Sequence, residues 1–151
     1  LRAHLARANG QLRDLRDGTP ALVLFHGPQA YVTPSWYASK REHGKVVPTW
    51  NYVTVQVRGQ PRVIDDPQWL IEQIAMLTRH HEAARDEPWT VADAPPAQLK
   101  GICGLEIPVA RIEGKWKVSQ NRPPLDRAGV AEGLAAGGHA ELATIVAAAH
   151  P

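Results

Sequence analysis

The chain has 151 residues, 44% of them hydrophobic, and this length is sufficient for one domain with a substantial core. Its formal net charge of +2 is too small to predict a nucleic-acid or membrane partner by itself. The single cysteine, Cys103, excludes an internal disulfide and fits a cytoplasmic protein, and no apolar run is long enough to cross a bilayer.

The first third of the chain predicts short strands separated by turns. Leu1 is not preceded by a methionine and opens directly into a strand pattern, so we expect that residues before it are missing. The apolar run at 21–25 predicts a strand that is buried on both faces. We expect the His-Gly-Pro sequence at 26–28 to break this strand before another short strand at 29–32.

The segment at 46–59 shows the longest strict alternation of side chains in the sequence, and it predicts the central strand. Valines occupy one face, while aromatic and polar residues occupy the other, as in a pleated and half-buried strand. Further along, Asp66 followed by Pro67 predicts the start of a long helix, because an acidic cap before a first-turn proline is a common helix start. We expect this helix to reach about Ala84.

The last third predicts two more strands and a helical tail. Strand character returns at 102–112, where Pro108 implies an edge position or a bulge. We expect a tight turn at 113–114 and a final strand at 115–119. The alanine-rich tail predicts helices from about 124 to 150, with a break at two adjacent glycines.

These elements amount to about six short strands, joined mainly by brief turns, and three or four helices. Regular alternation of strands with helices is absent, so the pattern predicts a mainly β fold, an antiparallel barrel with peripheral helices. We expect a single domain over residues 1–151.

Five phrases in order along the chain carry a resemblance to one family. They are HLARANGQ at 4–11, FHGPQAYVTPSWY at 25–37, VPTWNY at 47–52, RHHE at 79–82 and KWKVSQNR at 115–122. In this order and spacing they resemble the PaiB-type FMN-binding negative transcriptional regulators. That family belongs to the flavin-binding split-barrel group, together with pyridoxamine 5'-phosphate oxidases.

The resemblance covers essentially the whole chain and implies an FMN-binding split β-barrel that forms a homodimer with the flavin at the subunit interface. The family's domain begins well before the residues that match Leu1, which implies that N-terminal barrel strands are missing here. The family's helix start usually reads Asn-Pro-Gln, where this chain has Asn9-Gly10-Gln11.

A first candidate site lies at a predicted strand-to-helix junction and contains His4, Arg7 and Asn9. Backbone N–H groups at a helix start, together with an arginine, can bind an anion. The resemblance implies that the flavin phosphate binds here, with a bidentate contact from Arg7. The alternative is a solvated turn in which Asn9 caps the helix.

A second candidate site is the basic and amide-rich segment after 114. If this segment is a strand, Lys115, Lys117 and Ser119 share a face. The serine and the following side chains are directional donors and acceptors that suit a ring edge or a phosphate: Ser119, Gln120, Asn121 and Arg122. The alternatives are an exposed strand edge protected by lysines, and a contact to a dimer partner.

A third group combines aromatic residues with an amide, and within it we assign Trp50 and Asn51 to cofactor binding. Trp36, Tyr37 and Thr49 complete the group. Aromatic rings beside an amide can wall a planar ligand, although packing in the core or at a subunit interface is the alternative.

The remaining polar residues predict no metal site and no catalytic residue. His80 and His81 are adjacent on the predicted helix and therefore point about 100 degrees apart, which does not suit a shared metal. Cys103 lies in an apolar strand and is expected to be an inert, buried thiol.

Three functions follow, of which the first is preferred. By resemblance, the chain is an FMN-binding negative transcriptional regulator that acts as a homodimer, with promoter DNA as a partner and no membrane partner. The second is an FMN-dependent oxidoreductase of the pyridoxamine-phosphate-oxidase-like group, in which the flavin carries the chemistry. The third is a flavin-free dimeric barrel.

Overall fold

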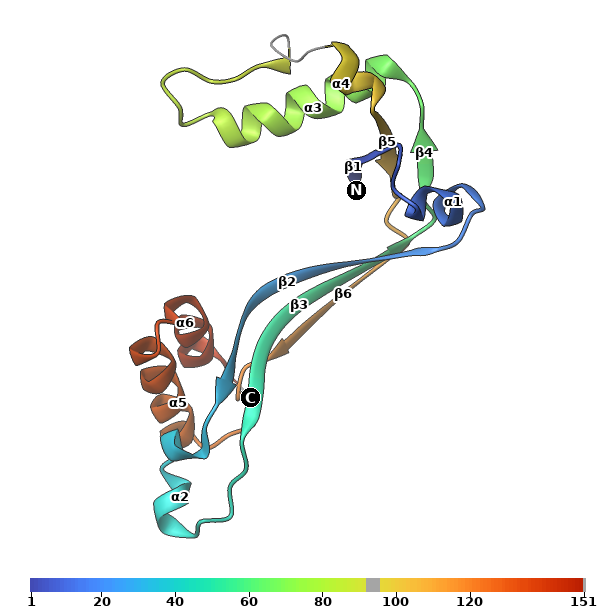
Figure 1. The fold of residues 1–151 in the computed structure, drawn as a ribbon. Coiled ribbons are helices and arrows are strands. Elements are labelled where there is room, and N and C mark those ends of the chain that lie inside the picture. Colours follow the sequence, from blue (N-terminus) through green and yellow to red (C-terminus); the bar gives the residue numbers. More distant parts are fainter. Residues whose placement is uncertain (92–95, 151) are drawn as a thin grey trace. The chain divides into compact units, whose positions relative to one another are not determined.

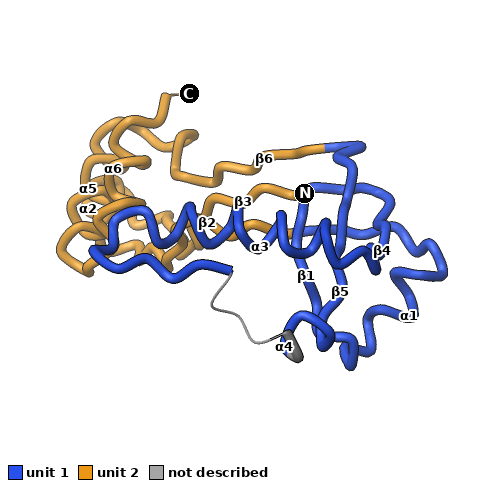
Figure 2. Tube along the Cα trace, turned by 90° about the horizontal axis from the view of Figure 1, so that it is seen from above, with its two compact units in different colours: residues 1–23, 57–111 blue, residues 24–56, 112–151 orange. Residues whose placement is uncertain are grey.

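The computed structural model describes residues 1–91 and 96–150, and the chain divides into two compact units (Figures 1 and 2). Unit 1 contains residues 1–23 and 57–111, and unit 2 contains residues 24–56 and 112–151. The described strands form two three-stranded sheets.

Unit 1 is built around the sheet of β1 (Arg2–Ala6), β5 (Ile102–Glu106) and β4 (Arg62–Ile64), in the order β1-β5-β4. Both pairings are antiparallel. The helices of this unit are α1 (Gln11–Arg16), α3 (Pro67–Glu82) and α4 (Pro96–Lys100).

The long helix α3 packs against this sheet at a glycine. A Cβ added at Gly104 would lie 2.4 Å from the ring of Trp69, so only glycine allows the indole to approach β5. The predicted start of α3 is confirmed: the Asp66 carboxylate accepts a hydrogen bond of 2.9 Å from the backbone N–H of Gln68, and Pro67 is the first helical residue. The helix ends at Glu82, two residues before the predicted end.

Unit 2 is built around the sheet of β2 (Ala21–Val32), β3 (Thr49–Gly59) and β6 (Arg111–Lys117). The start of β2, the end of β3 and the first residue of β6 belong to unit 1. The predicted central strand is confirmed, because β3 lies between β2 and β6. In Figure 1 the arrow of β3 runs opposite to those of β2 and β6. The other elements are η1 (Pro34–Trp36), α2 (Ser39–Glu42), α5 (Pro124–Ala136) and α6 (Ala140–Ala148).

The core of unit 2 lies between its sheet and the pair α5 and α6. These two helices occupy the region where the sequence predicts a helical tail, and the chain turns between them at Gly137 and Gly138. Aliphatic residues from both helices and from the sheet are buried in this core, together with Tyr37: Val32, Val118, Val130, Leu134, Leu142 and Val146.

The sequence predicts two breaks between strands that the structure does not contain, and each predicted break includes a glycine. The His-Gly-Pro sequence at 26–28 lies within the continuous strand β2. β2 is an edge of its sheet, where proline is tolerated, and Gly27 allows β3 to approach closely: an added Cβ would lie 3.1 Å from the Cβ of Val53. The apolar run at 21–25 is also not buried on both faces, since Leu24 is 47% exposed.

The predicted turn at 113–114 is likewise absent, because β6 runs through it without a break. Gly114 has a packing role there: an added Cβ would lie 2.2 Å from the ring of Trp116, which therefore lies over the glycine.

The fold class differs from the sequence prediction in the proportion of helix to strand. The described residues form small antiparallel sheets flanked by helices, but helices hold more residues than strands, so the fold is mixed rather than mainly β. Six strands are described, as predicted, and within the described segments they form two open sheets rather than a closed barrel.

Candidate functional site

A small cavity in unit 2 brings together many of the side chains singled out from the sequence. Its volume is about 90 Å³, and we call it the cationic cavity. It is lined by the start of β3, the end of β6 and the turn after β6: Thr49, Asn51, Lys117, Ser119, Asn121 and Arg122.

One wall of the cationic cavity is a buried hydrogen-bonded pair. Asn51 is fully buried, and its side-chain amide donates to the Ser119 hydroxyl at 2.9 Å. The Ser119 hydroxyl in turn lies 3.3 Å from the Asn51 carbonyl oxygen. On another side, the Lys117 ammonium donates to the Thr49 hydroxyl at 2.7 Å. These bonds connect β3 with the chain that leaves β6.

The turn after β6 is held in a defined conformation. Within the described segments, Ser119 is the one non-glycine residue in the left-handed region, with φ of 60°. The side chain of Gln120 braces the turn on both sides: it accepts from the N–H of Val118 at 2.9 Å and donates to the carbonyl of Trp116 at 2.8 Å. The N–H of Arg122 closes the turn by donating to the carbonyl of Ser119 at 2.9 Å.

Arg122 lies over the ring of Tyr37, with its guanidinium carbon 4.6 Å from the ring centroid. Tyr37 follows η1 and is 1% exposed. Its hydroxyl is buried and has no hydrogen-bond partner in the described part of the chain. Burial raises the pKa of Tyr37, and the nearby Arg122 guanidinium opposes this rise without cancelling it.

The charge of the cationic cavity is not neutralised by a direct ion pair. Among residues 1–91 and 96–150, neither Lys117 nor Arg122 forms an ion pair with a carboxylate. Two positive charges therefore meet hydroxyl and amide groups in a space suited to a small anion and too small for a ring system.

A second cavity of unit 2 is lined by two further residues assigned to the cofactor, Trp50 and Lys115. Its volume is about 290 Å³. The indole N–H of Trp50 donates to the side chain of Gln29 at 3.1 Å, and the Trp50 ring lies 6.5 Å from that of Tyr31. The cavity combines aromatic, apolar and hydrogen-bonding groups: Leu24, His26, Gln29, Trp50, Tyr52, Val53, Thr54, Gln56 and Lys115.

The first predicted site lies in unit 1, and each of its side chains makes a contact within that unit. Arg7 pairs with Asp65 and donates to the carbonyl of Lys100 at 3.0 Å. The hydrogen bond from Arg7 holds the pKa of Asp65 below its ordinary value. His4 Nδ1 lies 2.9 Å from the side-chain oxygen of the buried Gln73.

Asn9 lies just before the residue that precedes α1, Gly10, which makes no side-chain cap. Its side-chain oxygen accepts from the N–H of Gln11 at 2.9 Å, at the start of α1. This helix has six residues, too few to supply a strong dipole to an anion.

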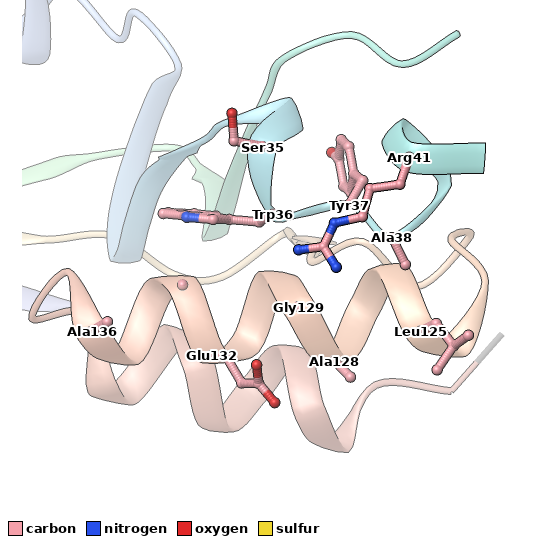
Figure 3. Close-up of a pocket in the computed structure, with 11 residues that line it drawn as sticks. Ser35, Trp36, Tyr37, Ala38, Arg41, Leu125, Ala128, Gly129, Glu132 and Ala136 are labelled. Atoms are coloured by element: carbon pink, nitrogen blue, oxygen red, sulfur yellow. The ribbon is translucent and has the colours of Figure 1, made fainter. Parts of the chain in front are cut away.

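Another cavity of unit 2 is lined by two residues of the predicted aromatic group, Trp36 and Tyr37, and by residues that the sequence does not single out. It has a volume of about 530 Å³ and lies between α5 and the segment of η1 and α2 (Figure 3). The ring of Trp36 lies flat over α5, Arg41 extends toward the same helix, and α5 contributes Leu125 and Glu132 to the lining of the cavity (Figure 3).

The part of the chain that the structure describes has no helix that is both long and apolar enough to cross a membrane. The same residues contain no group of three or more histidine, cysteine or acidic side chains that could hold a metal ion.

Comparison with known proteins identifies the family. The family described as "Putative FMN-binding domain" matches residues 1–111, nearly three quarters of the chain. The chain belongs to this FMN-binding family. The resemblance to PaiB-type proteins is thereby confirmed, and FMN is the family's cofactor, as the sequence predicts.

The matching curated relatives are longer than this chain. A protein of Bacillus subtilis, named protease synthase and sporulation protein PAI 2, is 36% identical over 135 residues, which cover 87% of this chain and 62% of the relative. An uncharacterized protein of Aspergillus fumigatus is 36% identical in an alignment of 170 positions, which covers 89% of this chain and 65% of the relative. The chain thus spans just under two thirds of these relatives.

Solved structures share the fold at low sequence identity. The flavocytochrome Anf3 of Azotobacter vinelandii matches with a TM-score of 0.55 and 13% identity, covering 77% of this chain and 49% of that protein. An FAD and heme binding protein of Mycobacterium smegmatis matches with a TM-score of 0.52 and 17% identity, covering 76% and 52%.

Proposed function

We propose that this chain binds FMN with the phosphate in the cationic cavity. The observation that carries this proposal is the convergence of Lys117 and Arg122 in a space that suits a small anion. Neither cation forms a direct ion pair with a carboxylate among the described residues, although Arg122 interacts electrostatically with Asp126. A guanidinium, an ammonium and a hydroxyl are the donors that phosphate oxygens accept from in proteins.

The residues of the cationic cavity divide into two roles under this proposal. Lys117 and Arg122 would balance the phosphate charge, and Asn121 would add a directional polar contact. Asn51 and Ser119 would keep the cavity open, because their mutual hydrogen bonds fix β3 to the turn. The flavin supplies the redox chemistry of its ring when it is bound.

We further propose that Trp50 and Lys115 contact the flavin ring. Their cavity has aromatic walls and several hydrogen-bonding side chains, which are the properties of a site for a planar, polar ligand. Arg7, which already pairs with Asp65, is expected to stabilise unit 1 whether or not it also contacts the cofactor.

The test is a comparison of FMN with riboflavin, which lacks the phosphate. Lys117→Ala and Arg122→Ala are each expected to weaken FMN binding by about tenfold or more, because a hydrogen bond to a charged group is worth roughly 1.5–3 kcal/mol. Riboflavin binding should stay unchanged. Flavin fluorescence quenching gives both dissociation constants, and FMN should also raise the melting temperature of the wild-type protein.

Lys45→Ala is the matched control, since it removes one exposed positive charge from unit 2 outside the cationic cavity. Equal losses for FMN and riboflavin in the two cavity variants, or an equal loss in the control, would place the phosphate elsewhere. A wild-type protein that binds no FMN would overturn the proposal as a whole.

We propose, as the biological role, negative regulation of transcription by an FMN-bound homodimer. The PaiB-type resemblance supports this role, and the name of the Bacillus relative refers to protease synthesis and sporulation. A mobility shift of promoter DNA that weakens steeply with salt is the expected result, because protein cations replace counterions on DNA phosphates. Turnover with a nicotinamide donor, without any DNA shift, would favour the oxidoreductase instead.

A further inference from the structure

The stack of Arg122 on Tyr37 joins two segments that are far apart in the sequence. Tyr37 follows the helical turn η1, and Arg122 ends the turn that follows β6. The guanidinium lies 4.6 Å from the centroid of the Tyr37 ring and at the same time lines the cationic cavity. Tyr37 itself does not line that cavity, so any effect of the ring on a bound anion must pass through Arg122.

A buried hydrogen-bonded joint fastens these two segments together. Asp126, which is 1% exposed, accepts from the N–H of Ser39 at 2.8 Å and from its hydroxyl at 2.6 Å. Ser39 lies two residues after Tyr37, and Asp126 lies four residues after Arg122. The ring is therefore held in place beneath the guanidinium by contacts that do not involve the cavity.

The geometry selects the ring, rather than the hydroxyl, as the part of Tyr37 that acts. The guanidinium lies over the ring face. It also opposes the rise in the pKa of the hydroxyl, but the buried hydroxyl makes no hydrogen bond of ordinary geometry among the described residues. A planar guanidinium stacks on an aromatic face and still presents N–H groups at its edge, which an ammonium group cannot do.

We propose that Tyr37 is a positioning residue, whose ring holds the Arg122 guanidinium in place at the cationic cavity and so sets the preference for phosphorylated over dephosphorylated flavin. This inference rests on the proposed function, because it takes the phosphate of FMN as the anion bound at Arg122.

The experiment measures the dissociation constants of FMN and riboflavin for the wild type, Tyr37→Phe, Tyr37→Leu and Arg122→Lys. Tyr37→Phe keeps the ring and should keep the wild-type preference for FMN. Tyr37→Leu removes the ring and should lower that preference about five- to tenfold, as should Arg122→Lys, which keeps the charge but loses the planar stack.

The double variant Tyr37→Leu, Arg122→Ala separates positioning from general destabilisation. If Tyr37 acts through Arg122, the leucine should change the FMN preference in the wild-type background and have no further effect once Arg122 is absent. Leu142→Ala is the control for a damaged core, since Leu142 is fully buried in the same core cluster: it should lower the melting temperature and leave the preference unchanged.

The two proposals fail in different ways. If Arg122→Ala abolishes the preference but Tyr37→Leu retains it, the positioning role is overturned and the phosphate site stands. An effect of Tyr37→Leu that persists without Arg122 also overturns it. A wild-type protein without any preference for FMN over riboflavin overturns the phosphate site and, with it, the role of Tyr37.

Discussion

Asp126 shows how a single buried carboxylate is kept charged in this protein. Burial alone would raise its pKa, but hydrogen bonds from the side chain and backbone of Ser39, with the nearby positive charge of Arg122, outweigh burial and hold the pKa of Asp126 below its ordinary value. The carboxylate also lies in the first turn of α5, where the helix dipole favours a negative charge.

We predict that Asp126→Ala lowers the free energy of unfolding by about 2–3 kcal/mol at neutral pH, because it leaves the buried groups of Ser39 without an acceptor. The pKa of Asp126 is lower in the folded chain, so its stabilising effect is complete above its unfolded value of 3.8 and is lost as the pH falls through the folded value. Urea unfolding at pH 7 and in the range below pH 4 measures both effects.

Asp126→Asn is the companion variant, since the amide oxygen can still accept one hydrogen bond but cannot titrate. It should lose less stability than the alanine variant at pH 7 and show a weaker loss in acid than the wild type. An acid-induced loss of equal size in all three proteins would mean that other carboxylates dominate.

Side chains that are neighbours in the sequence were predictable as a site, and partners from distant segments were not. Lys117, Ser119, Asn121 and Arg122 lie within six residues of one another, so their gathering at one cavity needs only a strand end and a turn. The pairing of Arg7 with Asp65 spans 58 residues, and no local pattern signals it. The role of Tyr37 beneath Arg122 is equally invisible before the chain is folded.

At the scale of elements, α5 depends on two glycines for its contact with η1. An added Cβ would lie 2.1 Å from the Trp36 carbonyl oxygen at Gly129 and 2.3 Å from the Trp36 ring at Gly133. Because a backbone oxygen cannot move aside as a flexible side chain can, the contact at Gly129 is the stricter of the two.

We predict that Gly129→Ala destabilises the protein by about 1–3 kcal/mol, the usual cost of overpacking a close contact. A loss of stability would be informative, because alanine inside a helix is otherwise favoured over glycine by roughly 0.5–1 kcal/mol. Thermal unfolding of the variant measures the effect. Gly10→Ala is the matched control: Gly10 has φ of −61° and nothing within 4 Å of an added Cβ, so its change should be neutral or slightly stabilising.

Elements with a strong local signal were predicted well, and edge strands were not. Alternation identified β3, and the Asp66 cap with Pro67 identified the start of α3. Gly27 and Pro28 do not break β2, and Gly114 does not break β6, because the effect of such residues depends on whether the strand is central or at an edge. Whether a strand is central or at an edge depends on the order of strands in the sheet, which the sequence of one segment does not reveal.

For the whole molecule, the exposed apolar side chains of β2, β3 and β6 bear on assembly. Several large apolar residues of these strands within unit 2 are about half exposed or more: Leu24, Phe25, Tyr31, Trp50, Ile112 and Trp116. The proposed homodimer would bury some of these side chains against a second copy of the chain.

We predict a sedimenting species of twice the 16.5 kDa chain mass, and a weaker association for Ile112→Arg by about tenfold or more. Ile112 is 64% exposed, so the change should not disturb the folded chain itself. Sedimentation equilibrium across protein concentrations gives both values. A monomer in the wild type would leave the exposed strands to another kind of partner.

The boundary of the family match has a practical consequence for anyone who trims the protein. The match ends at residue 111, which is the first residue of β6. A fragment cut there would lose a whole strand of the second sheet, both cations of the cationic cavity and the paired helices behind it. If such a fragment were colourless, the cause would be the loss of these parts, and the result would not show that the uncut chain fails to bind a flavin.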